Sequence, residues 1–344
     1  MASEHREFKN ILLIHFGQLG DVVLSLPAIR AVRARFAEAK LTIMSGLSTR
    51  GVIEISGLAD EQIAVDRVKM RDGGKIAAFG DMFDLVRELR RRKFDLVIDI
   101  HSLYETNLTA WLSGAPVRYF AHRDRRSIQR LSNWPVKAEI EDRSAHHTER
   151  YAAAVRPLGI EKVGHNFVAK PSSEAEVAAA KVLDRHDSAG KRLIGLFLGA
   201  GHPTRRWPVE RFVETAKEIS GECEVLVLLG PEEKDMRSGL QERFGEAATV
   251  VEELPLAIFF ALLARLDVFV SGDTGPMHLA AIAGAGVVLL STKGAPPIFT
   301  PLTERLVNIN DVPFEDITVD RVVTGIRKLL SEHTGSLKSP AARL

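Results

Sequence analysis

The chain has 344 residues, of which 45% are hydrophobic and 26% are charged, and its formal net charge is +1. This length exceeds what one hydrophobic core usually supports, so two globular domains are expected. The near-neutral charge excludes bulk electrostatic attraction to nucleic acid, and the single cysteine, Cys223, excludes a disulfide framework and a cysteine metal site.

The first ten residues are polar, and the apolar run that follows is too short for a signal peptide or a membrane span. A cytoplasmic protein is therefore expected. Short apolar runs typical of buried strands occupy residues 11–15, 41–44, 96–100, 193–197, 225–229, 268–270 and 287–290. Patterns typical of helices occupy residues 22–36, 76–91, 174–185, 209–219, 254–265 and 319–330. Continuous apolar strands separated by helices indicate parallel sheets that are covered on both faces.

The alternation of strands and helices is interrupted once, between residues 159 and 173, where Pro-Ser-Ser precedes a fresh series. We predict an N-terminal domain over residues 1–168, a C-terminal domain over residues 169–330 and a frayed tail over residues 331–344. Both domains are expected to be Rossmann-like α/β units. Because such sheets bind ligands beyond the carboxyl ends of their strands, we expect the site in a cleft between the domains.

The first predicted strand runs into HFGQLGDVVLSLPAIRAVRARF, where Gly17 and Gly20 predict a tight turn and Asp21 stands at the helix start. This is an incomplete dinucleotide fingerprint, because the third glycine is missing and no acidic residue is placed for a ribose about 20 residues on. Asp21 has two interpretations. It is either a helix cap or a carboxylate that takes the proton of a substrate hydroxyl.

The strand over residues 193–197 runs into LGAGHPTRRWPVERF. Gly199 and Gly201 allow the backbone a wider range of conformations. Arg205 and Arg206 supply guanidinium groups that could hold a diphosphate through bidentate hydrogen bonds. The alternative is a solvated basic loop in which Trp207 is a packing anchor.

Two further strand ends of the second domain carry polar residues. After residues 225–229, Glu232 and Glu233 stand where a ribose hydroxyl could bind, although acidic residues are common in the first turn of any helix. After residues 268–270, Ser-Gly-Asp-Thr-Gly-Pro opens a helix whose unpaired N–H groups could receive phosphate. The alternative is that Asp273 or Thr274 simply caps this helix. Three strand ends that each offer a phosphate or ribose element favour a nucleotide ligand.

The chain resembles the bacterial heptosyltransferases of glycosyltransferase family 9 over residues 10–330. The motifs that carry the resemblance are GQLGDVVLSLPAIRAVR, FDLVIDIHSL, TRRWPVERF and SGDTGPMHLAAIAGAGVVLLS. The resemblance implies the two-domain GT-B fold and an inverting, metal-independent glycosyltransferase without a cofactor. It also implies transfer of heptose from ADP-heptose to an acceptor hydroxyl, on the lipopolysaccharide inner core or another glycan.

By this resemblance Asp21 matches the catalytic base. Arg205 falls where a basic residue meets the donor diphosphate, and the donor-binding turn matches Asp273, Thr274, Gly275 and His278. No DxD cluster is present to hold a metal ion, and the histidines are scattered apart from His146-His147. The developing charge on the leaving group would then be stabilised by Arg205 and the helix N-terminus.

The acceptor side departs from the family pattern. Where the family commonly has D-x-Q-G-x-x-K-S, this chain has His101 and Ser102 in place of Gln-Gly and Glu105 in place of the lysine. A carboxylate there would repel an acidic acceptor. Near residue 291 the family usually runs F-G-x-T-x-P, and this chain reads STKGAPPIF, so base or sugar contacts are expected to differ.

A group of arginines supplies positive charge that could compensate for the missing lysine. The group comprises Arg118, Arg123, Arg125, Arg126 and Arg130. It could meet an anionic acceptor or the headgroups of the inner membrane, or it is an ordinary solvated face. The predicted acceptor side thus combines Gly17, Gly20, Glu105, Arg118 and Arg123.

Two alternatives to the transferase stay open. One is a nucleotide-sugar epimerase of GT-B build, which would need further acids and histidines in the cleft. The other is a catalytically silent nucleotide-sugar-binding protein, against which the intact Asp21 argues. The expected partners are a nucleotide-sugar donor and a glycan or glycolipid acceptor, with no nucleic acid.

Overall fold

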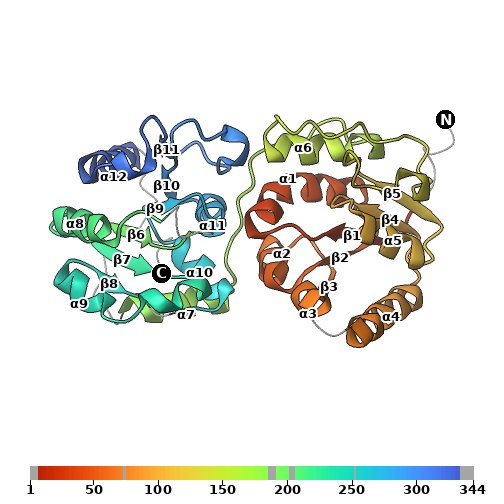
Figure 1. Cartoon of the computed structure of the whole chain (residues 1–344), viewed down its shortest axis with the longest axis horizontal. Helices are drawn as coiled ribbons and strands as arrows, with labels where there is room; N and C mark the ends of the chain where they lie inside the picture. The colour runs from red at the N-terminus through yellow and green to blue at the C-terminus, as the bar shows by residue number, and fades with distance from the viewer. Residues whose placement is uncertain (1–6, 73–74, 185–190, 201–205, 252, 334–344) are drawn as a thin grey trace. The chain divides into compact units, whose positions relative to one another are not determined.

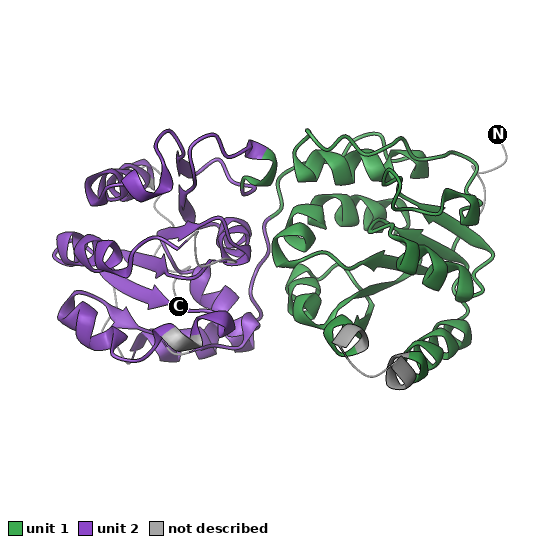
Figure 2. Ribbon diagram, in the orientation of Figure 1, with its two compact units in different colours: residues 1–167, 298–300 green, residues 168–297, 301–344 purple. Residues whose placement is uncertain are grey.

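The computed structural model describes residues 7–72, 75–184, 191–200, 206–251 and 253–333. The chain divides into two compact units, which Figure 2 colours separately. Unit 1 comprises residues 1–167 and 298–300, and unit 2 comprises residues 168–297 and 301–344. The predicted boundary falls after residue 168, and the observed division falls after residue 167. No sequence pattern indicated that residues 298–300 return to the first unit.

Unit 1 is built on a five-stranded parallel sheet in the order β3-β2-β1-β4-β5. Its strands are β1 (Asn10–His15), β2 (Lys40–Gly46), β3 (Glu61–Val65), β4 (Leu96–Asp99) and β5 (Val117–Phe120). Its helices are α1 (Leu19–Arg35), α2 (Arg50–Ser56), α3 (Arg67–Asp72), α4 (Lys75–Arg92), α5 (Tyr104–Leu112) and α6 (His147–Val155).

The order of the strands fixes where the loops of unit 1 meet. β1 lies between β2 and β4, with His15 opposite Ser45 and Ile14 opposite Asp99. Because the strands are parallel, the turns after β1 and β4 emerge side by side at the carboxyl edge of the sheet. α6 packs against α1 (Figure 1). The Thr148 hydroxyl donates to the carbonyl of Leu24 at 3.2 Å.

Unit 2 is built on a six-stranded parallel sheet in the order β11-β10-β9-β6-β7-β8. Its strands are β6 (Leu193–Phe197), β7 (Glu224–Leu228), β8 (Thr249–Val250), β9 (Val268–Gly272), β10 (Gly286–Leu290) and β11 (Leu306–Ile309). Its helices are α7 (Ser173–Asp184), α8 (Val209–Ile219), α9 (Leu240–Phe244), α10 (Leu256–Leu263), α11 (Gly275–Ala283) and α12 (Val319–His333). α8 packs against α9 and α12, and α10 packs against α7 and α11.

The predicted alternation of strands and helices is confirmed. All the predicted strands and helices are present, because their apolar residues are buried in the two cores. The strands without a predicted counterpart are β3, β5, β8 and β11, which lie at or next to sheet edges and have shorter or less apolar runs. α12 continues to His333, beyond the predicted end at residue 330, and the rest of the predicted tail lies outside the described residues.

Candidate active site

The turn after β1 can be made only with glycine at position 17. A Cβ atom on Gly17 would lie 2.6 Å from Cβ of Asp21 and 2.7 Å from Cε1 of His15, closer than real side-chain contacts allow. The backbone N–H of Gly17 in turn donates to Nδ1 of His15 at 3.3 Å. The glycine therefore lets the start of α1 approach the end of β1 closely. Gly20 follows in the first turn of α1 and is half-buried.

Asp21 stands in the first turn of α1, and both of its carboxylate oxygens have partners. Oδ2 accepts from the backbone N–H of Gln18 at 3.2 Å, and Oδ1 lies 3.3 Å from Nδ1 of His147. The cap interpretation is thus correct for one oxygen, but it does not exclude a role as base, because 29% of the side chain is exposed. Burial raises the pKa of Asp21, but the hydrogen bond from His147 and the charges nearby lower it more, so the net pKa lies below its ordinary value.

Two buried histidines lie beneath this carboxylate. His15 ends β1, His101 follows β4, and their ring centroids are 5.8 Å apart. Burial lowers the pKa of His15 to about 4 and that of His101 to about 2, so both rings are neutral near pH 7. Neither ring nitrogen of His101 has a hydrogen-bond partner among the described residues.

The pKa values of these histidines predict a measurable pH dependence of stability. The pKa of His101 is lower in the folded than in the unfolded state, so unfolding below about pH 6.5 takes up a proton there. As the pH is lowered from about 6 to about 5, we expect the free energy of unfolding of the wild type to fall by about 1.4 kcal/mol per pH unit more than that of His101→Gln. Urea unfolding followed by tryptophan emission, to which Trp111 and Trp134 of unit 1 contribute, measures this difference. Parallel stability curves for the two proteins would contradict the prediction.

Asp99 positions the turn that carries His101. Its Oδ1 accepts from the backbone N–H of Ser102 at 2.7 Å, and its Oδ2 accepts from the side-chain amide of Asn107 at 2.8 Å. Ser102 has a φ of 49°, in the left-handed region that favours glycine, which is the residue that the family resemblance implies at this position. Burial raises the pKa of Asp99 to about 6, so its ionisation opposes folding as the pH rises from about 4 to 6, opposite in sign to the histidines.

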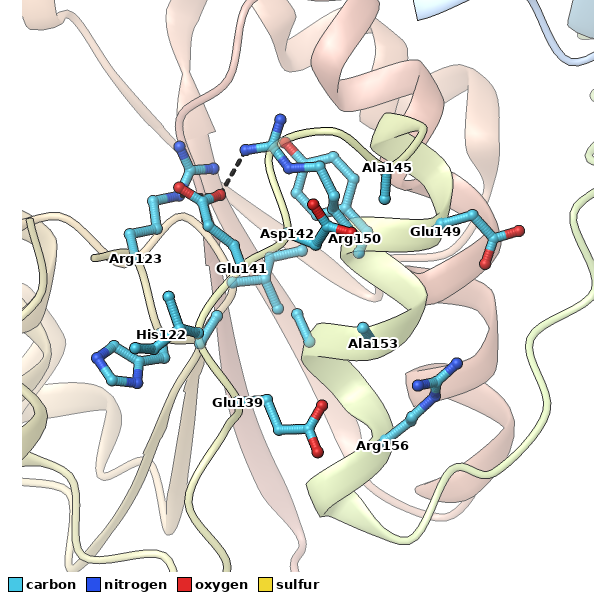
Figure 3. A pocket seen from close by; sticks show the side chains of 15 residues that line it. His122, Arg123, Glu139, Glu141, Asp142, Ala145, Glu149, Arg150, Ala153 and Arg156 are labelled. Carbon is cyan, nitrogen blue, oxygen red and sulfur yellow. Dashed lines mark hydrogen bonds and ion pairs between the residues drawn. The ribbon is translucent and has the colours of Figure 1, made fainter. Parts of the chain in front are cut away.

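An ion-pair network extends from Asp21 through α6. Nε2 of His147 lies 2.7 Å from a guanidinium nitrogen of Arg150, and Arg150 forms an ion pair with Glu141. Glu141 also lies 4.0 Å from Arg123, and Figure 3 shows its carboxylate between the two guanidinium groups. These three side chains line a cavity of about 250 Å³ next to α6. Sequence reasoning missed His147, Arg150 and Glu141, because no spacing relates them to Asp21 and only the packing of α6 on α1 brings them there.

The other predicted acceptor residues have different surroundings. Glu105, at the start of α5, forms an exposed ion pair with Arg67 at 3.5 Å. Arg67 lies over the ring of Phe16, 5.3 Å from its centroid. Arg118 does not join this group, because its guanidinium donates to the carbonyls of Leu131 at 3.0 Å and Ala115 at 2.5 Å. These two bonds tie the side chain to the backbone before and after β5.

In unit 2, the predicted ribose-binding residues differ in exposure. Glu232 is exposed, whereas Glu233 is buried and its Oε2 accepts from the backbone N–H of Gly230 at 3.0 Å. A Cβ atom on Gly199 would lie 2.4 Å from Cδ of Glu233, so the ends of β6 and β7 meet at this carboxylate. Burial raises the pKa of Glu233. Arg206 lies 3.7 Å from it, and Arg205 lies outside the described residues.

At the start of α11, after β9, the hydroxyl oxygen of Thr274 has no hydrogen-bond partner among the described residues. Thr274 occupies the N-cap position in extended conformation, yet its side chain makes no capping hydrogen bond with the described residues. Its Oγ1 is buried. Asp273 is exposed, Gly275 begins the helix and His278 is buried in its first turn. The side chain of Thr274 therefore does not cap α11, and its hydroxyl stands beside helix N–H groups that have no partner within the helix.

Within the described parts of the chain, no three His, Cys, Asp or Glu side chains are grouped so that they could hold a metal ion. None of the helices formed by the described residues is long and apolar enough to cross a membrane.

The described residues thus form two α/β units with parallel sheets, with a partly exposed carboxylate in the first turn of α1 in unit 1 and a buried threonine hydroxyl at the start of α11 in unit 2. The family model described as glycosyltransferase family 9 (heptosyltransferase) matches residues 82–318. The chain therefore belongs to this family, and it is a glycosyltransferase.

Individual relatives agree with this assignment. The lipopolysaccharide heptosyltransferase 2 of Salmonella typhimurium is 23% identical over 340 residues, covering 93% of this chain and 90% of the relative. The fold is similar to that of the crystal structure of a family 9 glycosyl transferase from Veillonella parvula, with a TM-score of 0.83, 22% identity and coverage of 95% and 98%. The structure of the E. coli heptosyltransferase WaaC with ADP gives a TM-score of 0.73, 18% identity and coverage of 93% and 99%. The predicted GT-B fold class is confirmed.

Proposed function

We propose that the protein is an inverting, metal-independent glycosyltransferase that moves heptose from ADP-heptose to a hydroxyl of the lipopolysaccharide inner core or another glycan. The observation that carries this proposal is Asp21, an ionised and partly exposed carboxylate held in place in the first turn of α1. Family membership and the names of the relatives support the donor and the acceptor.

In the proposed reaction, Asp21 takes the proton of the acceptor hydroxyl as that oxygen attacks the anomeric carbon. The new bond forms opposite the diphosphate, and the bond from the anomeric carbon to the diphosphate oxygen breaks with its electron pair leaving on the diphosphate. The configuration at the anomeric carbon is thereby inverted. The N-terminus of α11 and the basic side chains Arg205 and Arg206 would stabilise the charge on the leaving group.

The donor would bind in unit 2. The Thr274 hydroxyl, without a hydrogen-bond partner among the described residues, is available to a diphosphate oxygen. Glu233 lies at the meeting point of β6 and β7, where a ribose hydroxyl could approach. His278, in the first turn of α11, completes the donor residues that the family motif implies.

A prediction about Thr274 separates a ligand-binding role from a structural one. Thr274→Val keeps the shape of the side chain and removes a buried hydroxyl that has no hydrogen-bond partner among the described residues. We expect ADP affinity to fall about 5- to 10-fold while the protein becomes no less stable, because a buried unpaired polar group is costly. Calorimetric titration with ADP and thermal unfolding measure the two effects.

Thr215→Val is the matched control. The Thr215 hydroxyl donates to the carbonyl of Arg211 at 2.7 Å in α8, so its loss is expected to leave ADP affinity unchanged and to lower stability slightly. Unchanged ADP affinity in Thr274→Val would remove Thr274 from the donor site.

The acceptor would bind at unit 1, where Glu105 and Arg67 neutralise each other beside Phe16. The ion pair weakens the repulsion that Glu105 alone would exert on an acidic acceptor. If the acceptor is carried on a lipid, the protein acts at the cytoplasmic face of the inner membrane. The exposed Arg125 and Arg126 are candidates for a peripheral contact with anionic headgroups.

The first experiment is calorimetric titration with ADP, UDP and GDP, without metal and then with EDTA. ADP selectivity that persists in EDTA supports the proposed donor, and ADP-heptose is then tested with heptose-deficient lipopolysaccharide. An inverted anomeric configuration in the product, read by NMR, supports the mechanism. Selective UDP binding would overturn the ADP-heptose assignment, and no binding of any nucleotide would overturn the donor site.

A further inference from the structure

The side chain of His147 contacts the proposed base on one side and an arginine on the other. Nδ1 lies 3.3 Å from Oδ1 of Asp21, and Nε2 lies 2.7 Å from a guanidinium nitrogen of Arg150. Only 12% of the His147 side chain is exposed. A hydrogen bond at each ring nitrogen determines both the orientation of the ring and the position of its proton.

The position of the proton follows from the chemistry of arginine. A guanidinium group has only donors, so Nε2 of His147 must accept the hydrogen bond from Arg150. The ring is then neutral and carries its proton on Nδ1, from which it donates to Oδ1 of Asp21.

The arginine and the ring are themselves held in place. Arg150 forms an ion pair with Glu141, which also lies 3.5 Å from Arg143, and the carboxylate is visible beside Arg150 in Figure 3. The ring of Phe299, from residues 298–300 of unit 1, lies 4.1 Å from the ring of His147, centroid to centroid. The other ionisable groups near Asp21 and His147 are His15, His101, Arg123 and Tyr151.

We propose that His147 is a positioning residue for Asp21. Its Nδ1–H holds one carboxylate oxygen, and the backbone N–H of Gln18 holds the other, so that the exposed lone pairs of the carboxylate face the acceptor hydroxyl. The arrangement reverses the roles of the histidine and carboxylate in a Ser-His-Asp triad, because here the carboxylate is the base and the neutral histidine orients it. This inference rests on the proposed role of Asp21 as base.

The test compares His147→Asn with His147→Leu. Asparagine places an amide donor near the position of Nδ1, whereas leucine has none. With ADP-heptose and heptose-deficient lipopolysaccharide, we expect His147→Leu to lose about 10²-fold in kcat and to move the acid limb of the kcat/KM profile to higher pH, because the carboxylate loses a hydrogen bond. His147→Asn is expected to restore most of both. His165→Asn, an exposed histidine of the same unit, is the matched control.

A second measurement does not depend on turnover. In protein labelled with ¹⁵N-histidine, NMR is expected to show His147 as the neutral Nδ1–H form at pH 7, and the ¹³C carboxyl resonance of Asp21 to titrate at higher pH in His147→Leu. An imidazolium or the Nε2–H form would overturn the inference. An unshifted acid limb in an active His147→Leu would also do so. If instead Asp21→Asn keeps full turnover, the proposed function fails, and the NMR result still decides whether His147 donates to Asp21.

Discussion

Asp21→Asn is expected to reduce turnover about 10²- to 10⁴-fold, the usual contribution of a general base. The amide cannot accept the proton of the acceptor hydroxyl, and its NH₂ group would face the Nδ1–H of His147 or the N–H of Gln18. Because the nucleotide is proposed to bind in unit 2, ADP affinity should be unchanged. Initial rates with ADP-heptose and titration with ADP measure the two quantities.

Asp84→Asn is the matched control, because Asp84 is an exposed carboxylate on α4 of the same unit. It removes one negative charge from unit 1 without touching the turn after β1. Normal turnover in Asp21→Asn would remove Asp21 as the base. A loss of ADP affinity together with turnover would show that the substitution acts on the whole fold.

The sequence was sufficient to predict the centre of each sheet. The apolar runs of β1, β6 and β9 are buried on both faces, so their composition alone identifies them. β3 and β11 were missed because they are half-buried edge strands whose polar residues interrupt the pattern. Their positions are determined by the neighbouring strands, β2 and β10, and that information is not local.

The site was predictable only in part, for the same reason. Asp21 could be selected as a candidate from the sequence because it follows a local glycine turn at Gly17. Its partner His147 lies far along the chain and reaches Asp21 only because α6 packs on α1. Arg118 shows a second limit of prediction from sequence. A run of basic residues suggests an anion site, but a sequence cannot show that a guanidinium is already used by the carbonyls of Leu131 and Ala115.

Ser102 illustrates a departure from the family pattern that the structure explains. Its backbone has a φ of 49°, and its N–H donates to Asp99 at 2.7 Å. Its hydroxyl donates to the carbonyl of Ala121. These contacts offset the strain of a side chain in the left-handed region, so serine is accommodated where the family resemblance implies glycine. His101 is thereby held beside His15, and the turn after β4 is kept although its residues differ from the pattern that the family resemblance implies.

Gly17→Ala is expected to lower turnover about 10²-fold, although Gly17 has no side chain to take part in the reaction. The added methyl would lie 2.6 Å from Cβ of Asp21 and 2.7 Å from Cε1 of His15, and His15 is fully buried. α1 must then move away from β1 and carry Asp21 away from His147. Overpacking of this kind costs about 1–3 kcal/mol of stability, which thermal unfolding can measure alongside the initial rate.

Gly46→Ala separates the effect of this clash from that of glycine replacement in general. Gly46 ends β2, the neighbouring strand, and a Cβ atom there would have its nearest contact at 3.7 Å, an ordinary van der Waals distance. We expect Gly46→Ala to keep normal turnover and stability. Equal losses in the two variants would mean that this edge of the sheet tolerates no added side chain. Normal turnover in Gly17→Ala would show that the separation of Asp21 from His15 and His147 is not critical, which would weaken the role of Asp21 as a positioned base.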